Sequence, residues 1–254
     1  MQKMKQIRRS RALLSSFTVT QLHFKNPWIP AFFSFSFPGF GYVLQHRYLT
    51  AFAFLGWEIF INQHAHINQG ILYTLLGQFA KAKEILDQKW LMLYVGIYMY
   101  GIWDGYRSTL DMNKLYLLAD REDAPLSPLI ISTLEINYLD KRIPWLAATW
   151  SILIPGLGFF YCHKILKGFL TVCGTLTIIW LSHFPQAILS MMIGNFAHSK
   201  QIIDMQWMMY LPSIFFFVVY DSYANVVELN KLFEKEQAYF LRNNYQQPHF
   251  KMPI

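Results

Sequence analysis

The polar residues best suited to chemistry in this sequence occur in pairs, with the two members of each pair 117 positions apart. Asp104 and Asp221 each follow a long apolar run, where a carboxylate is costly unless it is solvated or paired. These aspartates could bind an ion or carry a proton. Alternatively, the two carboxylates could meet at an interface between the copies. The alternative is a carboxylate at a membrane surface that pairs with Lys114 or Lys231. The paired candidates are Asp104 with Asp221, Tyr106 with Tyr223, and His46 with His163.

The histidines and tyrosines of these pairs allow two interpretations each. His46 and His163 each precede a basic residue, so they could contact a lipid phosphate or titrate near neutral pH. The alternative places them at the ends of loops beside the membrane. Tyr106 and Tyr223 are most simply interpreted as aromatic anchors at the membrane interface.

An internal duplication explains the constant spacing. Without any gap, residues 13–116 match residues 130–233 at 31 of 104 positions, several times the level expected by chance. The sequence of each copy indicates the same order of segments. A lead-in rich in Ser and Thr is followed by a short apolar segment, a Pro-Gly-x-Gly break, a second apolar helix, an amphipathic stretch and a third apolar helix. The apolar segments expected before the break are 28–37 and 145–154, the second helices 48–61 and 165–181, and the amphipathic stretches 66–83 and 183–200.

The Pro-Gly-x-Gly segments should interrupt the helices. Proline lacks a backbone donor and clashes with the preceding turn, while glycine permits turns that other residues avoid. In lipid such a break is tolerated only where protein or water satisfies the freed backbone groups. The residues of the two breaks are Pro38, Gly39 and Gly41, and Pro155, Gly156 and Gly158.

The second copy resembles a known membrane module. Its residues 155–161, Pro-Gly-Leu-Gly-Phe-Phe-Tyr, are followed by Lys167-Gly168 and an apolar helix, and this pattern resembles the paired-helix module of the TM2-domain type and related small bacterial membrane proteins. The first copy matches more loosely, because Leu44 stands at the position of Tyr161 and Thr50-Ala51 replaces the Lys-Gly pair. The resemblance covers roughly 40 residues per copy. It implies an architecture and no common chemistry.

The composition predicts an integral membrane protein. Hydrophobic residues make up 54% of the 254-residue chain and charged residues only 15%. We therefore expect an all-α, polytopic helical membrane protein of the cell membrane, with two tandem homologous repeats and re-entrant or half-helix Pro-Gly segments. The expected divisions are a basic cytoplasmic N-terminus (1–12), a first membrane repeat (13–117), a polar linker containing proline (118–129), a second membrane repeat (130–234) and a polar C-terminal tail (235–254).

The number of spans is open at this stage. Three crossing segments per copy would give six spans and two copies of opposite orientation. If the segment before each break returns to its own side, four spans result and both copies have the same orientation. The second arrangement places more of the 22 lysines and arginines in the cytoplasm and is favoured for that reason.

Three classes of function fit these features. The first is a non-enzymatic scaffold or accessory subunit of a membrane complex, which implies membrane lipids and another protein as partners. The second is a small transporter, channel or lipid-handling protein with its site at the repeat interface. The third is an enzyme acting on lipid, with Asp104 or Asp221 as general base and a histidine nearby.

Other classes of function lack a sequence signal. The chain contains no Gly-rich phosphate loop, no His-Glu-x-x-His helix and no Gly-x-Ser-x-Gly turn, so we expect no catalytic residues, no metal and no cofactor. The net charge of +7 is explained by basic loops beside anionic lipid and does not require nucleic acid as a partner.

Overall fold

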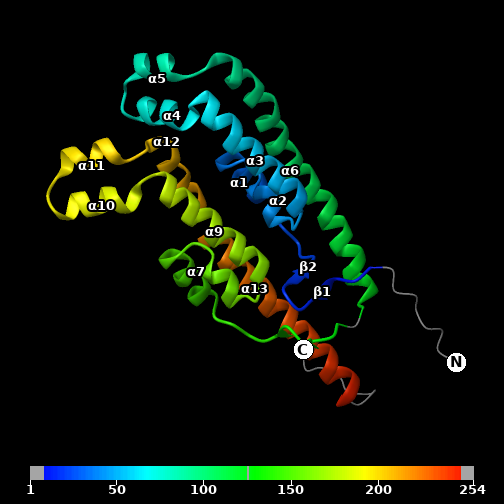
Figure 1. The fold of residues 1–254 in the computed structure, drawn as a ribbon. Helices are drawn as coiled ribbons and strands as arrows, with labels where there is room; N and C mark the ends of the chain where they lie inside the picture. Colours follow the sequence, from blue (N-terminus) through cyan, green and yellow to red (C-terminus); the bar gives the residue numbers. More distant parts are fainter. Residues whose placement is uncertain (1–8, 125, 247–254) are drawn as a thin grey trace.

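The computed structural model describes residues 9–124 and 126–246 of the chain, and these residues form a mostly helical protein (Figure 1). This agrees with the all-α prediction. Residues 1–8 and 247–254, which include most of the expected basic N-terminus and part of the C-terminal tail, lie outside the described residues. The elements of the first half are β1 (Ala12–Leu14), β2 (Val19–Gln21), α1 (Trp28–Ser36), α2 (Phe40–Leu44), α3 (Tyr48–Ala65), α4 (Ile67–Leu75), α5 (Phe79–Ile85) and α6 (Gln88–Glu122).

The second half repeats these elements in the same order, except that two helices, α12 and α13, take the place of α6. Several of them, such as β3, α8 and α10, begin 117 residues after their counterparts β1, α2 and α4. The elements are β3 (Leu129–Ile131), β4 (Ile136–Tyr138), α7 (Pro144–Leu153), α8 (Leu157–Tyr161), α9 (Ile165–Leu181), α10 (Phe184–Met192), α11 (Phe196–Ile202), α12 (Met205–Met208) and α13 (Tyr210–Asn244).

Each lead-in rich in Ser and Thr forms a small antiparallel hairpin, which the sequence analysis did not predict. β1 pairs with β2 so that Leu13 lies opposite Thr20, and β3 pairs with β4 in the same way. A serine closes both turns: Ser15 N–H donates to the Thr18 carbonyl at 2.9 Å, and Ser132 N–H donates to the Glu135 carbonyl at 3.2 Å. Val, Ile and Thr in the short strands suit a pleated, half-buried surface.

The Pro-Gly breaks have the same backbone geometry in both halves. Gly39 and Gly156 have φ values of 109° and 111°, a region that glycine adopts without steric cost. Two pairs of histidines also adopt positive φ, an uncommon conformation for residues with a side chain. They are His46 and His163 after α2 and α8, at 59° and 54°, and His66 and His183 before α4 and α10, at 54° and 53°.

Two predicted helical stretches differ from the structure in detail. Each amphipathic stretch is a pair of short helices, α4–α5 and α10–α11, joined at Gly77 (φ 72°) or Gly194 (φ 84°). The third helix is continuous in the first half, where α6 runs through residues 118–122 that the sequence had assigned to the linker. In the second half it is interrupted at Met209, three residues before Pro212, because proline disturbs the preceding helical turn.

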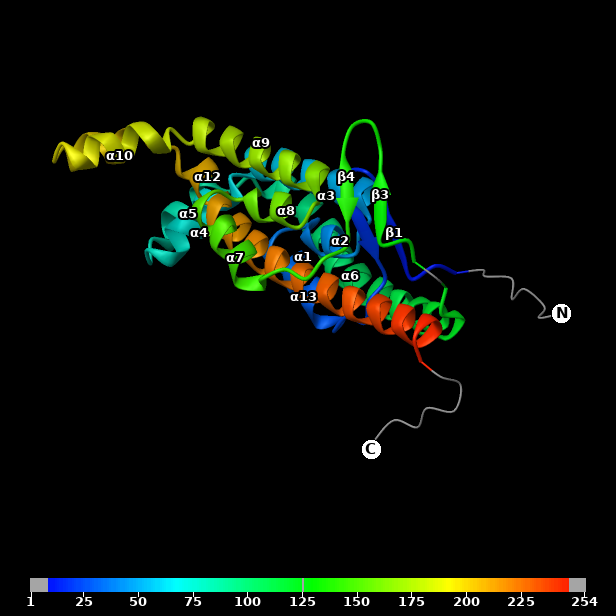
Figure 2. The ribbon, with the colours of Figure 1, turned by 90° about the horizontal axis from the view of Figure 1, so that it is seen from below.

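The two halves have the same orientation in the structure. The long helices α6 and α13 run in the same direction in both views (Figures 1 and 2). α1 packs against α6, and α7 packs against α13. Aromatic side chains from both halves form the core between them: Phe40 stacks on Phe217 with ring centroids 4.2 Å apart, and Phe33 meets Phe217 edge-on at 5.3 Å.

Among the described residues, no individual helix has both the length and the apolar character needed to cross a membrane alone. Two bent pairs of neighbouring helices meet these requirements together. They are Ile165–Leu181 with Phe184–Met192, bent by 58°, and Phe196–Ile202 with Met205–Asn244, bent by 79°. The predicted polytopic membrane fold therefore stays a proposal.

Candidate functional site

Asp221 forms a buried ion pair with Lys167. Lys167 lies near the start of α9 and Asp221 near the middle of α13, and their side chains are only 7% and 5% exposed. Asn225, one turn further along α13, donates from Nδ2 to Asp221 Oδ1 at 2.7 Å. A buried carboxylate needs such partners, because the loss of hydration is otherwise not compensated.

Asp104 has a different and more exposed partner. Arg47 Nη1 lies 3.0 Å from Asp104 Oδ2, and the arginine side chain is 38% exposed. The counterpart of Arg47 in the second half is Lys164, whereas Lys167 corresponds to Thr50. The basic residue that pairs with the aspartate therefore lies three positions later in the second half than in the first, which is about one helical turn.

Two sequence-based expectations for the aspartates are wrong. Lys114 pairs with Asp111 at 3.1 Å and Lys231 pairs with Glu228 at 2.7 Å, so neither lysine is the partner of Asp104 or Asp221. The two aspartates also do not pair with each other, because each binds a cation from its own half.

Two further lysines lie near the buried pair. Lys164, between α8 and α9, is 1% exposed, and its ammonium group makes no hydrogen bond or ion pair within residues 9–124 and 126–246. Burial, and next the charge of Lys167, lower the pKa of Lys164 to about 7. Lys25, between β2 and α1, donates to the Leu44 carbonyl, and burial lowers the pKa of Lys25 to about 8.

The histidine pair takes part in local structure. His46 Nδ1 lies 3.1 Å from the Tyr48 hydroxyl, and His163 Nε2 lies 3.0 Å from the Ser16 carbonyl oxygen. Burial lowers the pKa of His46 well below its ordinary value, and the charges of Lys164 and Lys25 add to this. This direction opposes the hypothesis that His46 titrates near neutral pH, because desolvation disfavours the imidazolium.

The tyrosine pair contacts tryptophans at equivalent positions. Tyr106 meets Trp28 edge-on, and Tyr223 meets Trp145 in the same way, with ring centroids 5.0 Å apart in both cases. Both tryptophans are exposed. Their role as membrane anchors stays a prediction.

A repeated asparagine fixes the segment before the first helix of each half. Asn113 Oδ1 accepts from Lys25 N–H at 2.9 Å, and Asn113 Nδ2 donates to the Lys25 carbonyl at 2.8 Å. Asn230 makes the same two bonds to Arg142, at 2.8 and 2.7 Å. Asn113 and Asn230 occupy matching positions in the two copies, and the structure gives their common role.

Asn113→Ala should lower the free energy of unfolding by about 1–3 kcal/mol, because both backbone groups of Lys25 lose their partner. Asn230→Ala should have a similar effect through Arg142. Chemical denaturation followed by circular dichroism measures both. Asn244→Ala is the control, because Asn244 bonds only to an exposed helical carbonyl, and its effect should stay within about 0.5 kcal/mol. Equal effects of Asn113→Ala and Asn244→Ala would contradict the assigned role.

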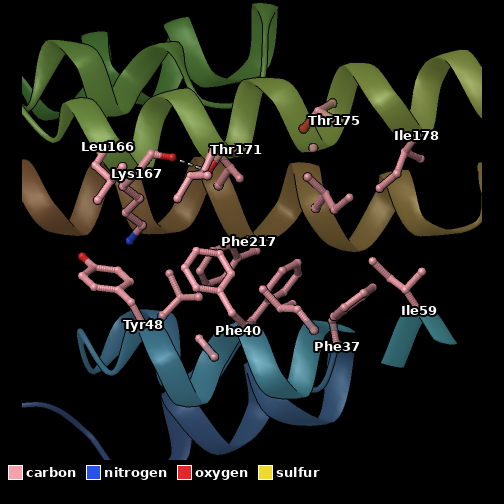
Figure 3. Close-up of a pocket in the computed structure, with 18 of the residues that line it drawn as sticks. Phe37, Phe40, Tyr48, Ile59, Leu166, Lys167, Thr171, Thr175, Ile178 and Phe217 are labelled. Atoms are coloured by element: carbon pink, nitrogen blue, oxygen red, sulfur yellow. Dashed lines mark hydrogen bonds between the residues drawn. The ribbon is translucent and has the colours of Figure 1, made fainter. Parts of the chain in front are cut away.

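An apolar groove of about 220 Å³ lies between the two halves, and we call it the interrepeat groove. Its walls come from α2 and α3 on one side and from α9 and α13 on the other (Figure 3). Lys167 and Tyr48 lie at the same end of it, with the ammonium and hydroxyl groups toward the gap. Representative lining residues are Phe37, Phe40, Ile59, Leu166, Ile178 and Phe217.

A second, more polar pocket of about 270 Å³ lies beside α13, and we call it the polar pocket. Lys25, Asp221, Asn225 and Glu228 are among its lining residues. Lys167 lines the interrepeat groove and Asp221 lines the polar pocket. The buried ion pair therefore stands between an apolar and a polar space.

Comparison with protein-family models, with curated proteins and with solved structures gave no match for this chain. The resemblance to the TM2-type module thus stays a prediction from the residues. Within the described part of the chain, no three His, Cys, Asp or Glu side chains are grouped so as to hold a metal ion.

Proposed function

We propose that this protein is an integral membrane protein that holds the acyl chain of a lipid in the interrepeat groove. The observation that carries the proposal is an apolar groove between the halves with a cation and a hydroxyl at one end. Lipids have the same division, with an apolar chain joined to a polar headgroup. Ligand sites are commonly concave and mostly apolar, with a few polar groups that fix orientation.

Exposed apolar side chains support a membrane environment. Helices α10 and α11 and the turn between them carry a group of them, and exposed apolar surface of this kind is typical of membrane or partner contacts. Burying such side chains in lipid stabilises them by about 25 cal/mol per Å². The exposed residues of this region include Leu189, Met191, Met192, Ile193 and Phe196.

The other two classes of function receive less support from the site. The lipid enzyme hypothesis needs a histidine close to Asp104 or Asp221, but within the described residues the side chains that hydrogen-bond to these carboxylates are Arg47, Lys167 and Asn225. The scaffold hypothesis is compatible with the exposed apolar surface, but it gives no reason for a groove that ends at a buried lysine.

A substitution that fills the groove tests the proposal. Gly174 lines the groove, and a Cβ atom added there would have no atom within 4 Å. Gly174→Phe should therefore place a ring in the groove without a backbone clash. Gly56 in α3 has the same free space but does not line the groove, so Gly56→Phe is the matched control.

We expect Gly174→Phe to retain about one tenth of the lipid that the wild type retains, or less. If the new ring displaces two methylene groups of the acyl chain from the groove, the binding free energy falls by about 1.6 kcal/mol. A tenfold loss of affinity corresponds to roughly 1.4 kcal/mol. Native mass spectrometry of protein purified from membranes in mild detergent measures the retained lipid. Gly56→Phe should retain lipid normally. Equal lipid retention by the wild type and Gly174→Phe would contradict the proposal.

A further inference from the structure

We infer that the lipid in the interrepeat groove is anionic, and that Lys167 binds a phosphate of its headgroup, with Lys164 and Lys25 supplying further positive charge. This inference rests on the proposed function and specifies its ligand. It concerns a phospholipid rather than free phosphate, because Lys167 stands at the end of an apolar groove.

The local charge balance favours an anion. Lys25, Lys164 and Lys167 are close enough to influence one another, and Asp221 is the carboxylate that pairs with one of them. Glu228 is engaged by Lys231 at 2.7 Å. A surplus of buried cations is unfavourable in a protein interior and is offset by binding a negative group.

Lys164 adds a further cation beside this ion pair. Its side chain is buried, and its ammonium group has no hydrogen-bond or ion-pair partner in the described residues. It precedes Lys167 by three residues, and the charge of Lys167 acts on it. Long cationic side chains are rarely buried without a partner.

The first half lacks the equivalent cluster. Thr50 replaces Lys167, and Arg47 replaces Lys164 and is committed to Asp104 at 3.0 Å. Lys167, the lysine that lines the groove, therefore has no counterpart in the first half, and Lys25 lines the polar pocket on the other side of the ion pair. We expect one anionic lipid per chain and not one per repeat.

The pH dependence follows from the two lysines with lowered pKa values. Lys25, with a pKa of about 8, and Lys164, with a pKa of about 7, gain protons as the pH falls from 8.5 to 6. The positive charge at the groove then rises, and an anion binds more tightly.

His23, with a pKa lowered to about 2 by burial, stays neutral in this range. The other titratable groups near Lys164 are Lys167, Asp221, Cys162, whose pKa burial raises to about 12, and His46, whose pKa is lowered.

The experiment compares phosphatidylglycerol with phosphatidylcholine. The full-length protein is placed in nanodiscs that contain both lipids, and native mass spectrometry measures which one is retained, at pH 6 and at pH 8.5. Phosphatidylglycerol is the suitable anionic probe, because its phosphodiester keeps the same charge at both pH values. The wild type should prefer phosphatidylglycerol, and more strongly at pH 6.

Variants of Lys164 test the role of the buried charge. Lys164→Gln should reduce the preference for phosphatidylglycerol by about tenfold and remove much of its pH dependence, as expected for a lost charge-assisted interaction. Lys164→Arg keeps the charge and should keep the preference. Lys114→Gln is the control, because it removes the same charge at an exposed position on α6 and should leave the preference unchanged.

The outcomes separate this inference from the proposed function. Retention of both lipids without preference, with loss of both in Gly174→Phe, would overturn the anionic inference and leave the groove as a lipid site. No retained lipid in the wild type would overturn the proposed function itself. Displacement of phosphatidylglycerol by millimolar inorganic phosphate alone would show a free phosphate site and overturn the assignment to a lipid headgroup.

Discussion

Asp221→Leu is expected to lower the free energy of unfolding by about 3–5 kcal/mol, because it leaves the Lys167 ammonium buried without its partner. The lysine side chain is 7% exposed, so water cannot replace the carboxylate. Asp104→Leu is the matched control from the first half. Its partner Arg47 is 38% exposed and can be hydrated, so the expected loss is about 1 kcal/mol or less.

Denaturation in detergent, followed by circular dichroism, measures both changes. A double variant sharpens the test: Lys167→Met together with Asp221→Leu should recover most of the lost stability, because buried pairs replaced by apolar residues of similar volume are often neutral. If Asp221→Leu and Asp104→Leu had equal effects, the two ion pairs would not differ in burial as described. If the double variant were as unstable as Asp221→Leu, the loss would not come from an unpaired lysine.

Gly158→Ala is expected to be similarly damaging, at about 3 kcal/mol or more, because it forces a methyl group into a closed backbone contact. A Cβ atom at this position would lie 2.2 Å from Ser151 Oγ and 2.3 Å from the Ala147 carbonyl oxygen. Gly41→Ala should behave in the same way, since its Cβ would lie 2.4 Å from the Pro30 carbonyl oxygen. The second glycine of each Pro-Gly-x-Gly break is thus required by close packing and not by its φ angle.

Gly174→Ala provides the control for this prediction. It is also a helical glycine, but an added Cβ would meet no atom within 4 Å. Alanine is favoured over glycine in helices by about 0.5–1 kcal/mol, so Gly174→Ala should be neutral or slightly stabilising. Thermal unfolding of the three variants measures the difference. A stable Gly158→Ala protein would show that α7 and α8 can separate at this point without loss.

Much of the helical pattern could be predicted from the sequence, because long apolar runs and Pro-Gly breaks act locally. The range 165–181 expected for one helix is the observed α9. The hairpins were missed because each strand has only three residues, too few for a clear alternation of apolar and polar side chains. The membrane topology depends on an environment that the chain alone does not contain.

The candidate site was only half predictable, because its two charged residues differ in how they match between the copies. Asp221 is identical in the two copies, whereas Lys167 is matched by Thr50 and stood out only as part of the TM2-type pattern, not as an ionic partner. Lys164 was found only as a neighbour of His163. Duplicated halves that share a fold can specialise where they differ, so a lysine at the start of an apolar helix with no counterpart in the other copy is the signal that could have found this site.

The first hairpin has a consequence for how the chain is assembled. It contacts the second half, where Ile165 N–H donates to the Phe17 carbonyl at 3.0 Å and His163 binds the Ser16 carbonyl. At synthesis rates of about 5–20 residues per second, roughly 7–30 seconds separate the appearance of Phe17 from that of Ile165. The β1–β2 hairpin therefore forms its contacts with the second half only after residues 163–165 have been synthesised. A nascent chain that stalls before His163 therefore has the hairpin without these two contacts to the second half.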